Sequence, residues 1–161
     1  MTVRSVASAI VPLMFAAAAF ASSDFTLDDQ FERTHRRADI FKDAPVVMIA
    51  GAQRKTPDAM QAWERVLRSR VPEGTRVVGL SNLKKLPFFV PKGSVRKTLA
   101  GKLPNTPVLF DWKGRVYSDL GFPAGAVISV GVFSAAGSRL GMVTGEQTDS
   151  RLAEVLELLS R

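Results

Sequence analysis

The apolar positions of this chain predict an alternation of buried strands and amphipathic helices. The segment 46–50 is an unbroken apolar run, which is typical of a strand covered on both faces of a sheet. After it the period changes, because Met60, Trp63 and Leu67 recur at helical spacing and give one apolar face. A buried strand that leads through a short loop into a helix is where α/β folds place their ligand sites. The pattern therefore predicts an α/β domain whose functional loop follows residue 50.

The start of this helix carries its own signals. Thr56 is a candidate N-cap, Pro57 suits the first helical position, and Asp58 places negative charge at the positive end of the helix dipole. We expect Thr56 and Asp58 to satisfy the free backbone N–H groups themselves and so to close the cap. The alternative is that these groups, with Arg54 and Lys55 beside them, hold a carboxylate, phosphate or sulfate.

The rest of the pattern continues the alternation. The first helix, expected over 57–69, leads into a second strand that runs parallel to the first, because strand–helix–strand connections cross over with a right hand. The last two strands are joined by a loop of small residues and form a hairpin. Residues 115–122 are either a helical turn or an extended piece, and 25–31 are an edge strand or lead-in. The predicted later strands are 75–80, 106–110, 126–133 and 139–144, and the predicted later helices are 93–100 and 148–159.

The first residues predict a secretory signal peptide. Arg4 supplies a positive start, 10–20 is an Ala-rich apolar run, and Ala19-Phe20-Ala21 is a small-x-small cleavage pattern. The run is short for a membrane span, and polar residues follow it. We expect cleavage near Ala21, with residues 1–21 removed and 22–161 forming one domain. This predicts a periplasmic or secreted protein, and an uncleaved anchor is the alternative.

The chain contains no cysteine. A core of this size makes disulfides unnecessary even in an oxidising compartment. Because there is no thiol, thiol-disulfide oxidoreductase and thiol peroxidase activities are excluded within this chain. The sequence also has no metal-ligand cluster, P-loop or dinucleotide fingerprint, so we expect no metal and no cofactor.

Positive charge is concentrated in one part of the chain. The formal charge is +7, and loss of Arg4 with the signal peptide would leave +6. No acidic residue lies between Glu73 and Asp111. Such a segment is either a solvated face or a surface for an anionic partner, which in a secreted protein means headgroups or an acidic protein rather than nucleic acid. The candidate anion-binding residues are Lys84, Lys85, Lys92, Arg96, Lys97 and Lys102.

Three other features attract attention but predict no chemistry. Phe88 and Phe89 are expected to plug the core beneath a loop rather than to form a ligand platform. His35 lies among arginines, so we expect a surface residue and not the base of a catalytic triad. Asp28 and Asp29 are adjacent on an extended segment and point to opposite faces, which favours a turn or the surface over paired acid chemistry.

Two segments carry a resemblance to a known family. Residues 106–111 with Trp112-Lys113-Gly114-Arg115-Val116 are similar to a strand and a D-x-x-x-x-V segment, and 133–145 are similar to a G-K-V-V-x-x-x-x-G hairpin. Together with the order of elements, they resemble the thioredoxin fold, in particular the secreted redoxins of the TlpA and ResA type. Ile49-Ala50-Gly51 and Leu109-Phe110-Asp111 are similar to the cysteine-free, periplasmic YtfJ-type branch. The resemblance implies a thioredoxin-like three-layer α/β sandwich with a mixed central sheet, a C-terminal β-hairpin and a closing helix.

The resemblance also implies where a redox site has been lost. Such redoxins carry W-C-x-P-C where this chain has Arg54-Lys55-Thr56-Pro57-Asp58, so Lys55 and Asp58 stand at the two cysteine positions. The family's cis-proline, where the backbone meets the substrate, corresponds to Ile128. Pro123, five residues earlier, is the alternative.

These observations lead to one leading hypothesis and two alternatives. We expect a non-catalytic binding or accessory protein of the cell envelope, whose partner is an envelope protein or peptide docking near 54–58 and 127–129, or anionic headgroups. One alternative is a non-thiol enzyme that uses Lys55 as base or nucleophile with Asp58, which requires a buried lysine. The other is a passive structural protein of the envelope. The sequence leaves the oligomeric state open.

Overall fold

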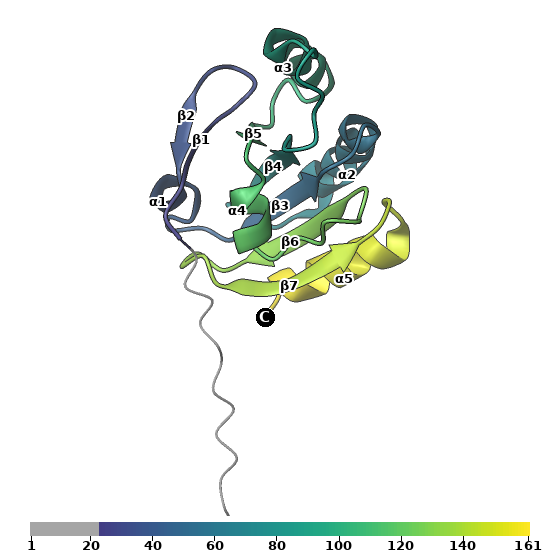
Figure 1. The fold of residues 1–161 in the computed structure, drawn as a ribbon. Coiled ribbons are helices and arrows are strands. Elements are labelled where there is room, and N and C mark those ends of the chain that lie inside the picture. Colours follow the sequence, from purple (N-terminus) through teal and green to yellow (C-terminus); the bar gives the residue numbers. More distant parts are fainter. Residues whose placement is uncertain (1–22) are drawn as a thin grey trace, which may run out of the picture.

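The structure is a computed structural model that describes residues 23–161, so the predicted signal peptide lies outside the described residues. A five-stranded sheet with the order β5-β4-β3-β6-β7 runs through the centre (Figure 1). The strands are β1 (Thr26–Asp28), β2 (Thr34–Arg36), β3 (Val46–Gly51), β4 (Arg76–Asn82), β5 (Val108–Asp111), β6 (Ser129–Phe133) and β7 (Arg139–Thr144). The helices are α1 (Arg37–Ile40), α2 (Thr56–Arg70), α3 (Lys92–Lys102), α4 (Arg115–Asp119) and α5 (Asp149–Leu159).

The sheet is mixed, as predicted. Strands β3, β4 and β5 run parallel to one another, and β6 pairs antiparallel with both β3 and β7. The parallel pairs are joined through α2 and α3, which is the crossover connection expected for neighbouring parallel strands. Strands β6 and β7 form the predicted C-terminal hairpin, and α5 follows it as the closing helix.

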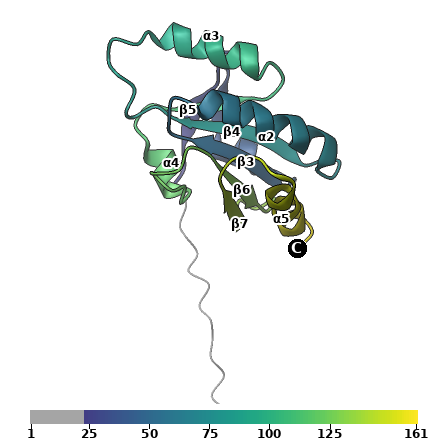
Figure 2. The same cartoon turned by 90° about the vertical axis from the view of Figure 1, so that its right-hand side faces the viewer.

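Two apolar layers cover the two faces of the sheet. Val47 and Ile49 of β3 pack with residues of α2, α3 and α5, whereas Val46, Met48 and Ala50 pack with α1, α4 and the segment before β1. Every residue of β3 is buried, which explains why its sequence is a continuous apolar run instead of an alternating one. Figure 2 shows α2, α3 and α5 on the same side of the sheet. The molecule is therefore the three-layer sandwich that the sequence predicted.

Helix α2 owes its position to the predicted stripe. Met60, Trp63 and Leu67 are completely buried against the sheet, and the Nε1–H of Trp63 donates to the Gly145 carbonyl over 3.1 Å. The helix ends at Arg70, just before a proline turn, as the sequence indicated. Residues 115–119, for which the sequence left two interpretations, form the short helix α4.

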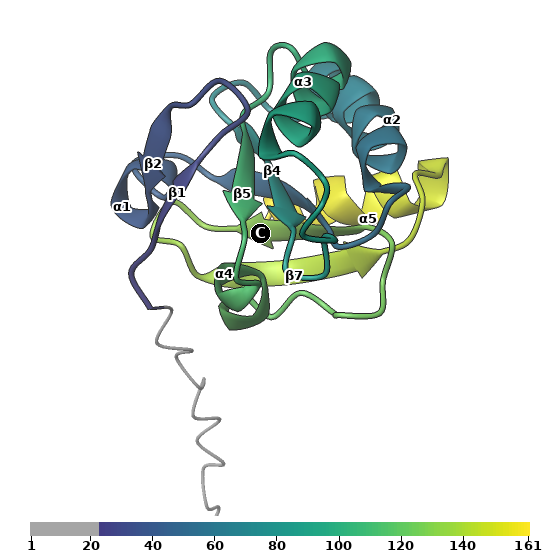
Figure 3. The same ribbon diagram turned by 45° about the horizontal axis from the view of Figure 1, so that its top comes forward.

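The β1–β2 hairpin is a separate two-stranded unit that lies beside β5 (Figure 3). The side chain of Gln30 joins the two. Its Nε2 group donates to the carbonyls of Leu103 and Thr106 over 2.9 and 2.8 Å, and its Oε1 accepts from the N–H of Val108 over 2.8 Å. A single buried amide therefore fixes the hairpin to the start of β5.

Candidate functional site

The loop between β3 and α2 lies at the carboxyl end of the central strand of the sheet. Arg54 and Lys55 are exposed there, and Thr56 is buried beneath them. The Thr56 hydroxyl accepts from the N–H of Gln53 over 2.9 Å and donates to the Val127 carbonyl over 3.1 Å. The loop is thus tied to the segment that leads into β6, which is the juxtaposition expected for residues 54–58 and 127–129.

The predicted closed cap on α2 is wrong. Lys55 is the N-cap residue, and its ammonium group cannot accept a capping bond from the backbone. The Thr56 hydroxyl, which was expected to cap the helix, bonds Gln53 and Val127 instead. The Asp58 carboxylate does not cap the helix either, since it pairs with Lys102 of α3. The Lys55 side chain consequently lies in solvent while the Asp58 carboxylate pairs with another cation, so Lys55 and Asp58 do not form a lysine–carboxylate pair with each other.

Ile128 lies directly behind the loop. Its side chain is completely buried in the core between the sheet and α2, and its carbonyl accepts from the N–H of Gly145 over 3.0 Å. The preceding residue, Val127, presents the carbonyl that meets Thr56. All peptide bonds of residues 23–161 are trans, including the one before Pro123.

A pocket of about 630 Å³ opens between this loop and the segment that follows β4. One wall is Ala52, Gln53 and Arg54. The other wall comes from residues 81–90 and includes Leu83, Lys85, Leu86 and Phe89. We call this pocket the β3–β4 groove. Its described lining residues include two cations and no acid, so the groove combines apolar surface with positive charge.

The predicted burial of Phe88 and Phe89 is wrong. Phe88 is 100% exposed and Phe89 is 73% exposed, because the segment between β4 and α3 runs outward over the groove instead of under a loop. This segment forms the outer bend beside α3 in Figure 2. The buried apolar side chains that follow this segment are instead Leu99 of α3 and Leu103 just after it, in the same core cluster as Val108 and Phe110 of β5.

Three of the six candidate anion-binding residues have partners within the described part of the chain. Lys102 pairs with Asp58, and Arg96 lies 3.6 Å from a Glu32 carboxylate oxygen. Lys92 places its Nζ 4.7 Å from the centre of the Trp112 ring. Lys84, Lys85 and Lys97 are exposed.

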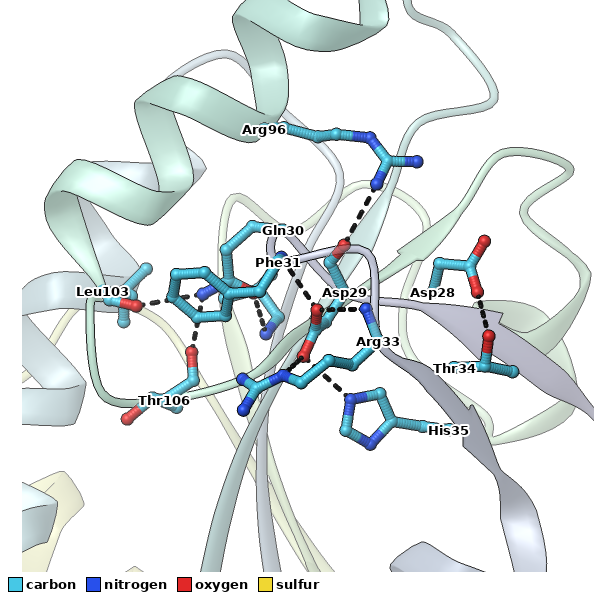
Figure 4. A network of polar contacts seen from close by, with 11 residues as sticks. Asp28, Asp29, Gln30, Phe31, Arg33, Thr34, His35, Arg96, Leu103 and Thr106 are labelled. Atoms are coloured by element: carbon cyan, nitrogen blue, oxygen red, sulfur yellow. Dashed lines mark hydrogen bonds and ion pairs between the residues drawn. The ribbon is translucent and has the colours of Figure 1, made fainter.

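A buried carboxylate, for which the sequence predicted a turn or the surface, lies in the turn between β1 and β2. Asp29 is in a turn, as expected, but its side chain is completely buried. One oxygen accepts from the backbone N–H groups of Phe31 and Arg33 over 2.8 and 3.0 Å, and the other meets Arg33 Nε at 3.0 Å and His35 Nε2 at 2.8 Å (Figure 4). These bonds hold the turn in which Glu32 adopts a left-handed φ of 63°.

The surroundings of Asp29 favour its charged form. Burial by itself would raise the pKa of this carboxyl, but the hydrogen bond from His35, the two backbone N–H groups and the Arg33 charge together lower the pKa below its ordinary value. His35 is correspondingly half-buried and engaged, which corrects its expected surface position. All the groups that approach Asp29 satisfy its oxygens, so the arrangement stabilises the turn and offers no free base.

Residues 23–161 contain no group of three His, Asp or Glu side chains placed to hold a metal ion. No helix within this described part combines the length and the apolar character needed to cross a membrane.

No protein-family model and no curated protein matches this sequence. Solved structures do match it. A secreted disulfide oxidoreductase of Mycobacterium tuberculosis homologous to E. coli DsbE is 13% identical with a TM-score of 0.59, covering 84% of this chain and 94% of that one. The peroxidoxin BcpB of the same organism is 21% identical with a TM-score of 0.64, covering 86% and 92%. The exposed lipoprotein thioredoxin of Streptococcus pneumoniae is 16% identical with a TM-score of 0.61, covering 84% and 98%.

Proposed function

We propose that this chain, which has a thioredoxin-like fold and no cysteine, acts in the cell envelope by binding a segment of another protein in the β3–β4 groove. The groove lies at the carboxyl ends of two parallel strands, which is where open α/β sheets bind their ligands. The chain has no sulfur nucleophile at this position or anywhere else in its sequence. Binding is therefore the activity that the remaining groups can support.

The lining of the groove supports a particular kind of segment. Leu83, Leu86 and Phe89 offer apolar contact, while Arg54 and Lys85 offer positive charge without an acidic neighbour in the described lining. An extended peptide that combines apolar side chains with a carboxylate complements both features. Gln53 and Asn82 add amide groups that can bond a peptide backbone.

An envelope location agrees with two independent observations. The first residues have the composition of a cleavable secretory signal. Two of the structurally similar proteins are called secreted or exposed by their own descriptions. A domain without cysteines also needs no oxidant to reach its folded state in such a compartment.

The exposed position of Lys55 argues against the alternative of a non-thiol enzyme. A lysine that serves as base or nucleophile is activated by burial or by a neighbouring charge. Lys55 is in solvent, and the carboxylate proposed as its partner pairs with Lys102. Binding in the groove needs neither group to be reactive.

The test is selection of random peptides displayed on phage against the expressed protein, followed by fluorescence anisotropy with the selected synthetic peptides. We expect selected sequences to combine apolar and acidic residues. Arg54→Glu should weaken their binding at least tenfold, because it places a negative charge in the groove wall. Arg70→Glu, at the exposed end of α2, is the matched charge reversal and should leave binding unchanged.

Insulin reduction and peroxide turnover, measured on the same preparation, should be absent. Selected peptides that bind Arg54→Glu and the native protein equally well would contradict the proposal, and so would thiol-type turnover.

A further inference from the structure

Phe88 and Phe89, beside the β3–β4 groove, are more exposed than a contribution to the groove wall requires. Phe88 is 100% exposed, does not line the groove, and meets Phe89 edge-on with the ring centres 5.7 Å apart. The other large apolar side chains exposed in residues 23–161, Phe31 and Leu140, reach only 38% and 36%. A fully exposed phenylalanine gains none of the free energy that burial of its ring would provide. A surface that covers Phe88 would recover it.

Cations flank these rings on both sides. Lys84 and Lys85 precede them, Lys92 follows them, and all three are exposed. The Lys92 ammonium lies 4.7 Å from the centre of the Trp112 ring. No acid occurs between Glu73 and Asp111, so nothing in this part of the chain neutralises the loop. We call residues 84–92 the aromatic–lysine tip.

The chemistry of the tip matches an anionic bilayer better than a protein. A stable protein interface buries about 800 Å² on each partner and is depleted in lysine. Membrane-surface binding instead uses a few aromatic side chains that enter the headgroup region, with lysines that remain among the lipid phosphates. Two adjacent rings between lysines therefore match membrane-surface binding and do not match a stable protein interface.

We propose that the aromatic–lysine tip docks this protein on an anionic phospholipid surface. Phe88 and Phe89 enter the headgroup region, and Lys84, Lys85 and Lys92 contact lipid phosphates. This inference rests on the exposed rings and does not depend on the proposed peptide binding. Because Phe89 and Lys85 also line the groove, Phe88 is the residue that separates the two activities.

The test is co-sedimentation of the expressed protein with phosphatidylcholine vesicles that contain or lack phosphatidylglycerol. We expect binding only to the vesicles with phosphatidylglycerol, decreasing with salt. Phe88→Ser should lower the partition coefficient about tenfold. Lys84→Gln should lower it about fivefold.

Matched controls keep the test specific. Phe31→Ser removes another partly exposed phenylalanine and Lys42→Gln another exposed lysine, and both should bind as the native protein does. Since Phe88 is fully exposed, Phe88→Ser should also keep the native melting temperature and the native affinity for groove peptides.

Three outcomes would overturn the inference. The first is absence of binding to phosphatidylglycerol vesicles. The second is equal vesicle binding by Phe88→Ser and the native protein. The third is a Phe88-dependent complex with an acidic protein in the absence of vesicle binding, which would assign the tip to a protein partner.

Discussion

Replacement of Gln30 by alanine tests how the β1–β2 hairpin is held to the sheet. The Gln30 amide makes three buried hydrogen bonds, to Leu103, Thr106 and Val108, with donor–acceptor distances of 2.8–2.9 Å. Each such bond contributes about 1 kcal/mol net, so the loss should be about 3 kcal/mol, rising to about 5 kcal/mol where the freed backbone groups stay dry. Gln30→Ala should therefore lower the free energy of unfolding by about 3–5 kcal/mol.

The measurement is urea unfolding followed by circular dichroism, with linear extrapolation to water. Gln61→Ala is the matched control, because its amide makes one partly buried bond to the Lys102 carbonyl and should cost about 1 kcal/mol or less. The Val108 amide should also exchange faster with solvent in Gln30→Ala. A loss no larger than that of Gln61→Ala would refute the reasoning that this side chain anchors the hairpin.

Three further perturbations probe the turn and the loop. Because the pKa of Asp29 is lowered in the folded state, its charge stabilises the protein above about pH 4, and this contribution disappears as the pH falls further. The difference in the free energy of unfolding between the native protein and Asp29→Asn should therefore shrink between about pH 5 and pH 2, as measured by urea titrations. Gly51→Ala should lower the free energy of unfolding by about 1–3 kcal/mol and lower the affinity for peptides in the β3–β4 groove, since a Cβ there would lie 2.7 Å from the Val127 carbonyl oxygen. An unchanged melting temperature would argue against this close approach. Lys55 and Asp58 lie three residues apart at the start of α2, so Lys55→Cys combined with Asp58→Cys should form a disulfide that dithiothreitol reduces, as measured by thiol titration. Free thiols under oxidising conditions would contradict the expectation that these two positions correspond to the cysteine pair of secreted redoxins.

The central elements were predictable because their patterns admit only one solution. The run that became β3 is apolar at every position, and burial on both faces is the only arrangement that covers it. The stripe of Met60, Trp63 and Leu67 likewise fixes which face of α2 meets the sheet. Local periodicity was sufficient for both elements.

Thr56 and Asp29 have side-chain partners that the local sequence pattern does not reveal. Thr56 has the residue type of an N-cap, but its hydroxyl donates to Val127, 71 residues away, and only the folded chain brings the two together. Asp29 follows the last residue of β1, so the alternation rule for strands does not extend to it. The carboxylate turns inward because the backbone of the turn and His35 supply its bonds.

The error at Phe88 and Phe89 has a different origin. Apolar side chains are buried only where the path of the backbone brings them against other apolar groups. The segment between β4 and α3 runs outward over the groove, so the rings of Phe88 and Phe89 stay exposed. The lysines on both sides were the available signal, because charged neighbours on a short loop keep it in water.

The bond between Gln30 and the N–H of Val108 has a consequence for self-association. Val108 begins β5, the strand at one margin of the sheet, and a second chain that extended the sheet there would need this donor. The donor is already occupied by a side chain of the same molecule. This side-chain bond therefore disfavours the pairing of a strand from a second chain with the start of β5.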